Sequence, residues 1–280
     1  ILDNIKFSSA IASIDSWFTW DETGTQITGL SDEGKNQKRI VLPSKATSIT
    51  NNAFTNNKTL VSVDMSLTSI TSFLSGATYE NGRGTFRSCS NLNSITLPES
   101  IQNIGDYSFY YCASLRTINF PNTLKNIRRY AFNSCNSLTS VIIPNSVTSI
   151  ASSVFFQCSS LKSVTLPNDL KRIDFYSFGR CALTSIKLPD SLKTIDVGGF
   201  ESNPLTSITF PKSLTTINGY AFLDCSSLTS IKIPNSVTTI GDNAFKNVPS
   251  TCVMYVSSTW DQTLATNVGY TGTFVIDDSL

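Results

Sequence analysis

The stretch from Leu138 to Ser160, LTSVIIPNSVTSIASSVFFQCSS, is the template for most of the chain, because near-copies of it recur along the sequence. The copies follow one another with a period of 22 or 23 residues and occupy Leu92–Ser114, Leu115–Ser137, Leu161–Ala182, Leu183–Pro204, Leu205–Ser227 and Leu228–Ser250. A fixed period in this range is typical of a solenoid, in which each repeat forms one coil and contacts mainly its neighbours.

Three columns of identical residues fix the register of the repeats. The phenylalanine column is Phe86, Phe109, Phe132, Phe155, Phe178, Phe200, Phe222 and Phe245. The proline column is Pro98, Pro121, Pro144, Pro167, Pro189, Pro211 and Pro234. The cysteine column is Cys89, Cys112, Cys135, Cys158, Cys181 and Cys225, with Asn203 in the remaining slot.

Each repeat reads Leu-x-x-Ile/Val-x-Leu/Ile/Phe-Pro, then x-x-Leu/Val-x-x-Ile, then x-x-x-x-Phe-x-x-Cys. In Leu161–Cys181, the alternation of Val164 and Leu166 with polar residues predicts a short strand. The proline that follows lacks a backbone donor and ends that strand. Leu170 and Ile173 then predict a second short extended segment that points inward again. One coil buries too little apolar surface to fold alone, so we expect the coils to stack into a β-rich solenoid with a parallel β-sheet on one face.

The repeat resembles the leucine-rich repeats of BspA-like bacterial surface proteins. The resemblance rests on Leu-x-x-Ile/Val-x-Leu followed by Pro-x-Ser-Val/Leu-Thr-x-Ile-x-x-x-Ala-Phe-x-x-Cys, which Leu138–Cys158 and Leu228–Phe245 match closely. It extends from about Ile27 to Ser250. The resemblance implies a right-handed leucine-rich repeat superhelix on the cell surface or secreted. It also implies a role in adhesion, since some members of that family bind host extracellular-matrix proteins.

Composition narrows the classes of partner. The 280 residues include 21 basic and 20 acidic ones, and the net charge of +1 gives no attraction to nucleic acid or to an anionic membrane. No apolar run approaches the ~20 residues of a membrane span, so we expect no membrane insertion. The sequence begins at Ile1 rather than at methionine. We expect it to be part of a longer precursor whose signal peptide lies outside this sequence.

We expect one continuous repeat domain over residues 1–280, because a repeat array counts as a single body. Residues 1–39 precede the register and predict an N-terminal cap, with Trp17, Phe18 and Trp20 covering the core or, as the alternative, forming an aromatic ligand platform. Residues 40–250 hold the repeats. An insertion near residues 72–83 predicts a surface loop in which Tyr79, Glu80 and Arg83 either contact a partner or have no function. Residues 251–280 predict a C-terminal cap sealed by Trp260, Tyr270 and Phe274.

Seven cysteines raise the question of disulfides. Six of them share one column, and stacked side chains point the same way, which disfavours the geometry of a disulfide between neighbouring coils. We therefore expect a buried column of structural thiols. Cys252 lies outside the column and is the thiol that we expect to be prone to oxidation. With no histidine and no CxxC pair, we expect no zinc site and no cofactor.

The predicted sheet face is a candidate ligand surface made of three columns of polar residues. Hydroxyls and scattered cations predict either a solvated strand face or a binding face for an extended protein or glycan. The first two columns are Asn93, Arg116, Thr139, Lys162, Thr184, Thr206 and Thr229, and Ser94, Thr117, Ser140, Ser163, Ser185, Ser207 and Ser230. The third is Asp64, Thr96, Asn119, Ile142, Thr165, Lys187, Thr209 and Lys232.

A second candidate surface lies on the opposite arc of the coils. Tyr107, Tyr130, Tyr176 and Tyr220 each stand two residues before a column phenylalanine. Aromatic faces beside cations suit an acidic glycan or a protein loop, although each tyrosine equally fits simple packing on the next coil. The nearby cations are Lys125, Arg128, Arg129, Lys171, Arg172 and Lys193.

Catalysis has little support in the sequence. Histidine, the commonest general base, does not occur, and the sequence contains no Gly-rich phosphate loop or nucleophile elbow. We therefore expect a monomeric adhesion or protein-interaction module rather than an enzyme, with a protein or glycan ligand bound on a solenoid face. The alternative is a structural stalk or spacer that presents another domain.

Overall fold

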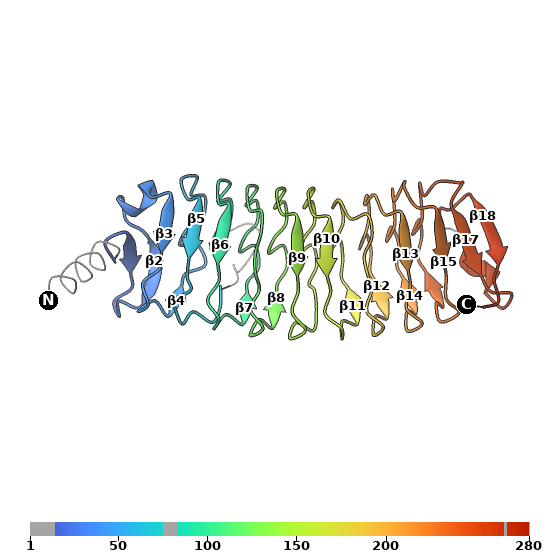
Figure 1. The fold of residues 1–280 in the computed structure, drawn as a ribbon, viewed down its shortest axis with the longest axis horizontal. Coiled ribbons are helices and arrows are strands. Elements are labelled where there is room, and N and C mark those ends of the chain that lie inside the picture. The colour runs from blue at the N-terminus through green and yellow to red at the C-terminus, as the bar shows by residue number, and fades with distance from the viewer. Residues whose placement is uncertain (1–14, 75–82, 266–267, 280) are drawn as a thin grey trace. The chain divides into compact units, whose positions relative to one another are not determined.

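The computed structural model of the protein describes residues 15–74, 83–265 and 268–279. The chain divides into two compact units, Ile1–Leu138 and Thr139–Leu280. Each unit is a parallel β-solenoid in which successive coils place equivalent strands side by side (Figure 1). The predicted fold class is confirmed.

Within its described residues, the first unit contains short strands and a 3-10 helix. Two strands form an antiparallel pair at its start, β1 (Phe18–Trp20) and β2 (Gln26–Leu30), and η1 (Gly34–Asn36) follows. The remaining strands are all parallel to their partners. They are β3 (Arg39–Val41), β4 (Ser48–Ile49), β5 (Ser62–Asp64), β6 (Ser94–Thr96), β7 (Asn103–Ile104) and β8 (Asn126–Ile127).

The second unit repeats the same alternation of three-residue and two-residue strands. Its three-residue strands are β9 (Ser140–Ile142), β10 (Ser163–Thr165), β13 (Ser207–Thr209) and β15 (Ser230–Lys232). Its two-residue strands are β11 (Arg172–Ile173), β12 (Thr194–Ile195), β14 (Thr216–Ile217) and β16 (Thr239–Ile240). The last elements are β17 (Val253–Val256), η3 (Gln262–Ala265) and β18 (Thr273–Ile276).

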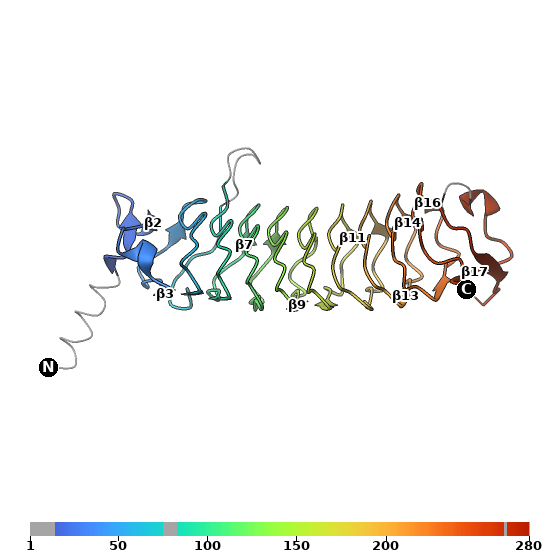
Figure 2. The same cartoon turned by 90° about the horizontal axis from the view of Figure 1, so that it is seen from above.

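Within each unit the two kinds of strand form two different sheets. The longer strands build what we call the wide sheet, β3-β5-β6 in the first unit and β10-β9 and β13-β15-β17-β18 in the second. The shorter strands build the narrow sheet, β7-β8 in the first unit and β11-β12-β14-β16 in the second. Figure 2 shows β9 and β13 along one edge of the coils and β11 and β14 along the other.

The ends of the repeat array join these sheets. Ile27 of β2 pairs with Ile49 of β4, so part of the predicted N-terminal cap lies in the narrow-sheet register.

Ser72 bridges to Asn103 and Phe73 is buried, so the extra length of the insertion follows Phe73. Tyr79 and Glu80 lie outside the described residues, and Arg83 is exposed. The prediction of a single domain with two caps stays a prediction.

The phenylalanine column forms the centre of each core. In the first unit Phe54, Phe86, Phe109 and Phe132 stack face to face, with ring centroids 4.9, 5.3 and 5.0 Å apart. In the second unit Phe155, Phe178, Phe200, Phe222 and Phe245 stack at 5.4 to 5.8 Å. All of these side chains are buried, so each coil gains a large apolar contact from the coil on either side.

The cysteine column lies beside the phenylalanines, and all seven cysteines of the chain are buried thiols. The Sγ atom donates a hydrogen bond of 3.0 to 3.3 Å to the carbonyl oxygen of the column phenylalanine one coil earlier, as in Cys89 to Phe54, Cys112 to Phe86, Cys135 to Phe109, Cys181 to Phe155 and Cys225 to Phe200. Cys252 is also fully buried, so the prediction that it is exposed to oxidation is wrong.

One repeat of the second unit lacks the strand that the sequence predicts. Between Cys181 and Leu183 the chain has one residue, where Cys158 and Leu161 are separated by two. This shortened turn precedes Ser185–Leu188, which carries no strand, although β10 and β13 on the neighbouring coils are formed. The turn alone is not the cause, because Asn203 and Leu205 are also separated by one residue and β13 follows them. The narrow sheet continues through the same coil, where β12 pairs with both β11 and β14.

Candidate functional site

The wide-sheet face presents the predicted ligand residues to solvent. Arg116 and Asn119 are exposed in the first unit, and Lys162, Thr165 and Lys187 are exposed in the second. The central residue of each strand points into the core, and its two neighbours face outward, as in the exposed-buried-exposed patterns of β9, β10 and β13. The columns are therefore where the alternation places them, and their binding role stays a prediction.

Two members of this face depart from a uniform hydroxyl surface. Ile142 of β9, which pairs with Thr165 of β10, is 69% exposed. Lys232, registered with Thr209, forms an ion pair of 2.9 Å with Asp277 and lies 5.4 Å from the ring centroid of Tyr255. Lys232 is thus held by the end of the chain, whereas Lys162 and Lys187 have no ion pair among the described residues.

In the first unit the tyrosines of the column pack against neighbouring side chains and do not form an exposed ligand surface. The rings of Tyr107 and Tyr130 stack with centroids 4.9 Å apart, and Tyr107 is buried. The guanidinium of Arg87 lies 5.5 Å from the ring of Tyr107 and 4.8 Å from that of Tyr110. Arg87 was not among the cations that the sequence singled out, because it stands near the tyrosines only once the coils stack.

In the second unit the column is interrupted by Gly198. A Cβ atom on Gly198 would lie 2.3 Å from the ring of Tyr176, so the glycine makes room for that ring. Burial, with the nearby Glu201 and Tyr220, raises the pKa of Tyr176. Tyr220 is 39% exposed. The column therefore favours packing of the tyrosines on neighbouring coils over a continuous aromatic platform.

Two arginines on this arc neutralise buried carboxylates. Arg172 pairs with Asp174 and with the buried Asp196, which also accepts a hydrogen bond of 2.7 Å from Asn218. Burial alone would lower the pKa of Arg172, but the two carboxylates raise it. Arg180 pairs with the buried Glu201 at 3.0 Å. These contacts link adjacent coils and explain why charged side chains lie inside this arc.

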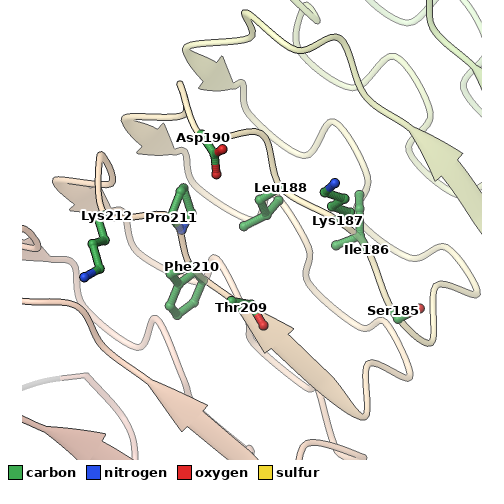
Figure 3. Close-up of a pocket in the computed structure, with 9 residues that line it drawn as sticks. All are labelled: Ser185, Ile186, Lys187, Leu188, Asp190, Thr209, Phe210, Pro211 and Lys212. Carbon is green, nitrogen blue, oxygen red and sulfur yellow. The ribbon is translucent and has the colours of Figure 1, made fainter. Parts of the chain in front are cut away.

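Around Ser185–Leu188 the structure has a feature that the sequence did not reveal. A pocket of about 580 Å³ lies between this segment and the following coil. Figure 3 shows Leu188 on one coil facing Phe210 and Pro211 on the next, with Lys212 and Ser185 at opposite ends. A second pocket of about 250 Å³ lies on the other side of the segment, next to Val164 and Leu166, and Lys187 lines both.

Among the described residues, no group of three or more Cys, Asp or Glu side chains is arranged to hold a metal ion. The helices within the same residues are too short or too polar to cross a membrane.

Comparison with known families gives one match that covers most of the chain. The family described as the BspA type leucine rich repeat region matches in six copies, over residues 25–80, 80–203 and 156–262. A search among curated proteins found no match.

Several solved structures are similar to the chain. A leucine-rich repeat protein from Bacteroides ovatus is 25% identical, with a TM-score of 0.73 over 93% of this chain and 66% of its own length. A leucine rich cell surface protein from Faecalibacterium prausnitzii is 22% identical, with a TM-score of 0.52 over 93% and 92%. The leucine rich repeat protein of T. pallidum is 23% identical, with a TM-score of 0.52 over 93% and 97%. The chain thus spans just under two thirds of the Bacteroides ovatus protein.

Proposed function

The chain belongs to the BspA-type leucine-rich repeat family, and from this we propose that it is an interaction module at the bacterial cell surface or secreted from the cell. In this proposal it binds a protein or glycan of a host or matrix through the wide-sheet face, acts as a monomer and performs no catalysis. The location rests on family membership, and the choice of face rests on the exposed columns.

The observation that carries the proposal is the outward row of polar side chains on the wide sheet. Parallel pairing keeps equivalent residues in register from coil to coil, as between Ser163 and Ser140 or between Ser207 and Ser230. Side chains at such positions form a regular surface that an extended partner can follow. Lysines at positions 162 and 187 add positive charge to this row without an ion pair among the described residues.

The test is a binding assay of the whole chain against immobilised extracellular-matrix proteins and a glycan array. A wide-sheet variant with Lys162→Glu and Thr165→Glu is compared with a matched variant, Lys171→Glu and Lys193→Glu, whose changes flank the narrow sheet. We expect the first variant to lose binding and the second to retain it. Equal binding by both variants would contradict the assignment of ligand binding to the wide-sheet face.

A stalk or spacer role is the alternative function, and the same assay separates it from adhesion. A spacer binds none of the immobilised proteins or glycans, with or without the substitutions. The length of the Bacteroides ovatus relative beyond the matched part leaves room for such a division of roles in a longer protein.

A further inference from the structure

We propose that the free edge of β18, at the end of the wide sheet in the second unit, binds an extended segment of a partner protein as an added parallel strand. The segment that fits this edge is apolar at alternate positions and carries a basic residue at its end. The edge is separate from the outward row of polar side chains on the wide sheet, so the inference goes beyond the proposed function. In Figure 1, β18 is the outermost strand of its sheet, next to β17.

The backbone of β18 is paired on one side only. The order of this sheet is β13-β15-β17-β18, so β17 is the single neighbour of β18 among the described strands. Asp277 donates its N–H to the oxygen of Val256, which shows which backbone groups face β17. Because the backbone groups of successive residues alternate between the two edges of a strand, those of Phe274 and Ile276 point away from β17. Neither residue makes a backbone hydrogen bond outside the β17 ladder within the described parts of the chain.

The apolar core is also uncovered at this strand. Phe274 and Ile276 pair with Met254 and Val256 of β17, which are 1% and 3% exposed. In β18 the same two positions are 36% and 57% exposed. Paired residues of adjacent strands lie on the same face of a sheet, so the buried apolar columns of this unit end open at β18. Apolar side chains at alternate positions of an added strand would cover them.

A buried polar atom lies beside the same strand. The ring of Trp260 stacks on that of Phe274 with centroids 5.7 Å apart, and Trp260 is 8% exposed. Its Nε1 atom is buried and has no hydrogen-bond acceptor among the described residues. Buried donors are nearly always paired in a complete core, so this atom indicates that the core is incomplete at β18 without an occupant.

The sequence of β18 does not protect the edge against pairing. Exposed edge strands usually carry a charged residue, a proline or a bulge, each of which hinders the addition of another strand. The strand reads Thr-Phe-Val-Ile, and its ladder with β17 runs through four residue pairs without an irregularity. A regular, uncharged and apolar edge of this kind suits strand addition, in which main-chain hydrogen bonds supply much of the affinity.

The charge at the end of β18 favours a basic residue on the occupant. Hydrogen bonds from Ser279 and Lys232 lower the pKa of Asp277 to about 2, and hydrogen bonds from Ser258 lower that of Asp278. Lys232 forms an ion pair with Asp277, whereas Asp278 has no ion pair among the described residues. In the parallel direction that the described ladders of this unit share, an added strand would end near Asp278. A cation there would gain a partner.

The test uses the whole chain and a fluorescein-labelled peptide of sequence Thr-Val-Thr-Ile-Thr-Val-Lys in a fluorescence polarisation assay. Two comparison peptides are methylated on alternate backbone nitrogens, one at the odd and one at the even positions. An added strand turns only one of these sets toward β18, so one methylated peptide should lose binding and the other should keep it. A fourth peptide has Glu in place of Lys.

The protein variants separate strand pairing from apolar contact. Ile276→Pro removes the outward N–H and the apolar side chain, whereas Ile276→Ala removes the side chain alone. Proline is tolerated on an edge strand where its nitrogen faces away from the sheet, so the ladder with β17 is retained. Asp278→Asn removes the charge. Ile142→Ala, at another exposed isoleucine of the wide sheet, is the matched control.

We expect the peptide to bind the unchanged chain, and Ile276→Pro to bind it at least about tenfold more weakly. Ile276→Ala should bind it about threefold more weakly, and Asp278→Asn about two- to threefold more weakly. The control should stay within about twofold of the unchanged chain. Circular dichroism confirms that each variant is folded. If Ile276→Pro does not fold, the pair of methylated peptides decides.

Four results overturn the inference. They are no peptide binding, equal binding of the two methylated peptides, equal or tighter binding of the Glu peptide, and a dimer in analytical ultracentrifugation that Ile276→Pro converts to a monomer. In the last case a second copy of the chain occupies the edge. The Lys162→Glu and Thr165→Glu variant leaves β18 unchanged, so the matrix-protein assay and this one can fail independently.

Discussion

At the scale of single residues, the cysteine column acts as a row of hydrogen-bond donors. Asn203 makes the same contact as the thiols of Cys89, Cys112, Cys135, Cys181 and Cys225, which donate to the carbonyl oxygen of a column phenylalanine one coil earlier. Its Nδ2 lies 2.7 Å from the oxygen of Phe178. Asn203 has a second task, since its Oδ1 accepts the N–H of Leu183 at 3.1 Å. In regular coils the corresponding leucine N–H donates to the cysteine carbonyl, as Leu161 does to Cys158. Asn203 therefore compensates for the shortened turn.

This compensation predicts that the consensus residue is unfavourable at position 203. Asn203→Cys would leave the buried N–H of Leu183 without an acceptor, and we expect the free energy of unfolding to fall by ~1–3 kcal/mol. Chemical denaturation measures the change. The same substitution combined with a serine inserted between Ala182 and Leu183 should recover most of the loss. A single variant as stable as the unchanged chain would contradict this account.

Left-handed backbone conformations flank the phenylalanine column. Two residues before it, Tyr107, Tyr130 and Tyr176 have φ of 57°, 57° and 51°, and two residues after it Ser202 has φ of 53°. Side chains with a Cβ atom are disfavoured in this region, and β-branched ones most of all.

Ser202 is the position where this cost is simplest to measure. We expect Ser202→Val to lower the free energy of unfolding by ~1–2 kcal/mol, and Ser202→Gly to leave it unchanged or raise it. Thr209→Val, on an exposed strand position, is the control and should have little effect. Chemical denaturation ranks the three variants, and a glycine variant less stable than the valine variant would refute the argument.

At the scale of one coil, the stacked ring is the main contact with the next coil. Phe178 is fully buried between Phe155 and Phe200, with centroids at 5.6 and 5.8 Å. Phe178→Ala should lower the free energy of unfolding by ~3–5 kcal/mol through lost burial and a cavity. Phe175, three residues earlier and 44% exposed, is the matched control. Phe175→Ala should change the stability by less than about 0.5 kcal/mol, as measured by urea unfolding.

Much of each coil could be predicted from the sequence, because the repeat makes local patterns unambiguous. The column of Phe86, the strand around Val164 and the inward turn at Ile173 all occupy their predicted places. Alternation with period two leaves one register that buries the apolar face, and repetition confirms it many times over. The sequence-based prediction was wrong where it assumed that every repeat forms the same strand, because Ser185–Leu188 carries none.

The candidate site was less predictable, because it depends on contacts between coils. Ser185–Leu188 carries no strand, and whether a segment pairs is a property of three coils together. Likewise Arg87 and Glu201 acquire their roles only from the coil beside them. The short spacing from Cys181 to Leu183 is not a signal of the missing strand, because Asn203 and Leu205 have the same spacing and β13 follows them.

At the scale of the whole chain, two features govern how stability depends on pH. They are the absence of histidine and the raised pKa values of the buried thiols. Histidine does not occur in the sequence, so no side chain has its ordinary pKa between pH 5 and 8. Burial raises the pKa of Cys89 and Cys225 to about 12, and those of Cys112 and Cys181 lie well above the usual 9.0.

These shifts predict how stability depends on pH. Thiols whose folded pKa is raised favour the folded state fully below pH 9, where the unfolded chain also keeps them protonated. Above pH 9 the unfolded chain loses the protons first, so the free energy of unfolding should fall between about pH 9 and 12. We expect a flat profile from pH 5 to 8 in urea unfolding. Cys225→Ala, as a control, should fall less steeply in the alkaline range, and a maximum near pH 10 would contradict the assignment.

The unequal state of the two sheets in the second unit has a mechanical consequence. The narrow sheet is continuous from β11 to β16, while the wide sheet is interrupted at Ser185–Leu188. The continuous narrow sheet would act as a hinge, and the coils would separate on the side of the interrupted wide sheet. Under a pulling or bending load, deformation of this unit would concentrate at that one coil, since flexing there breaks no ladder of hydrogen bonds.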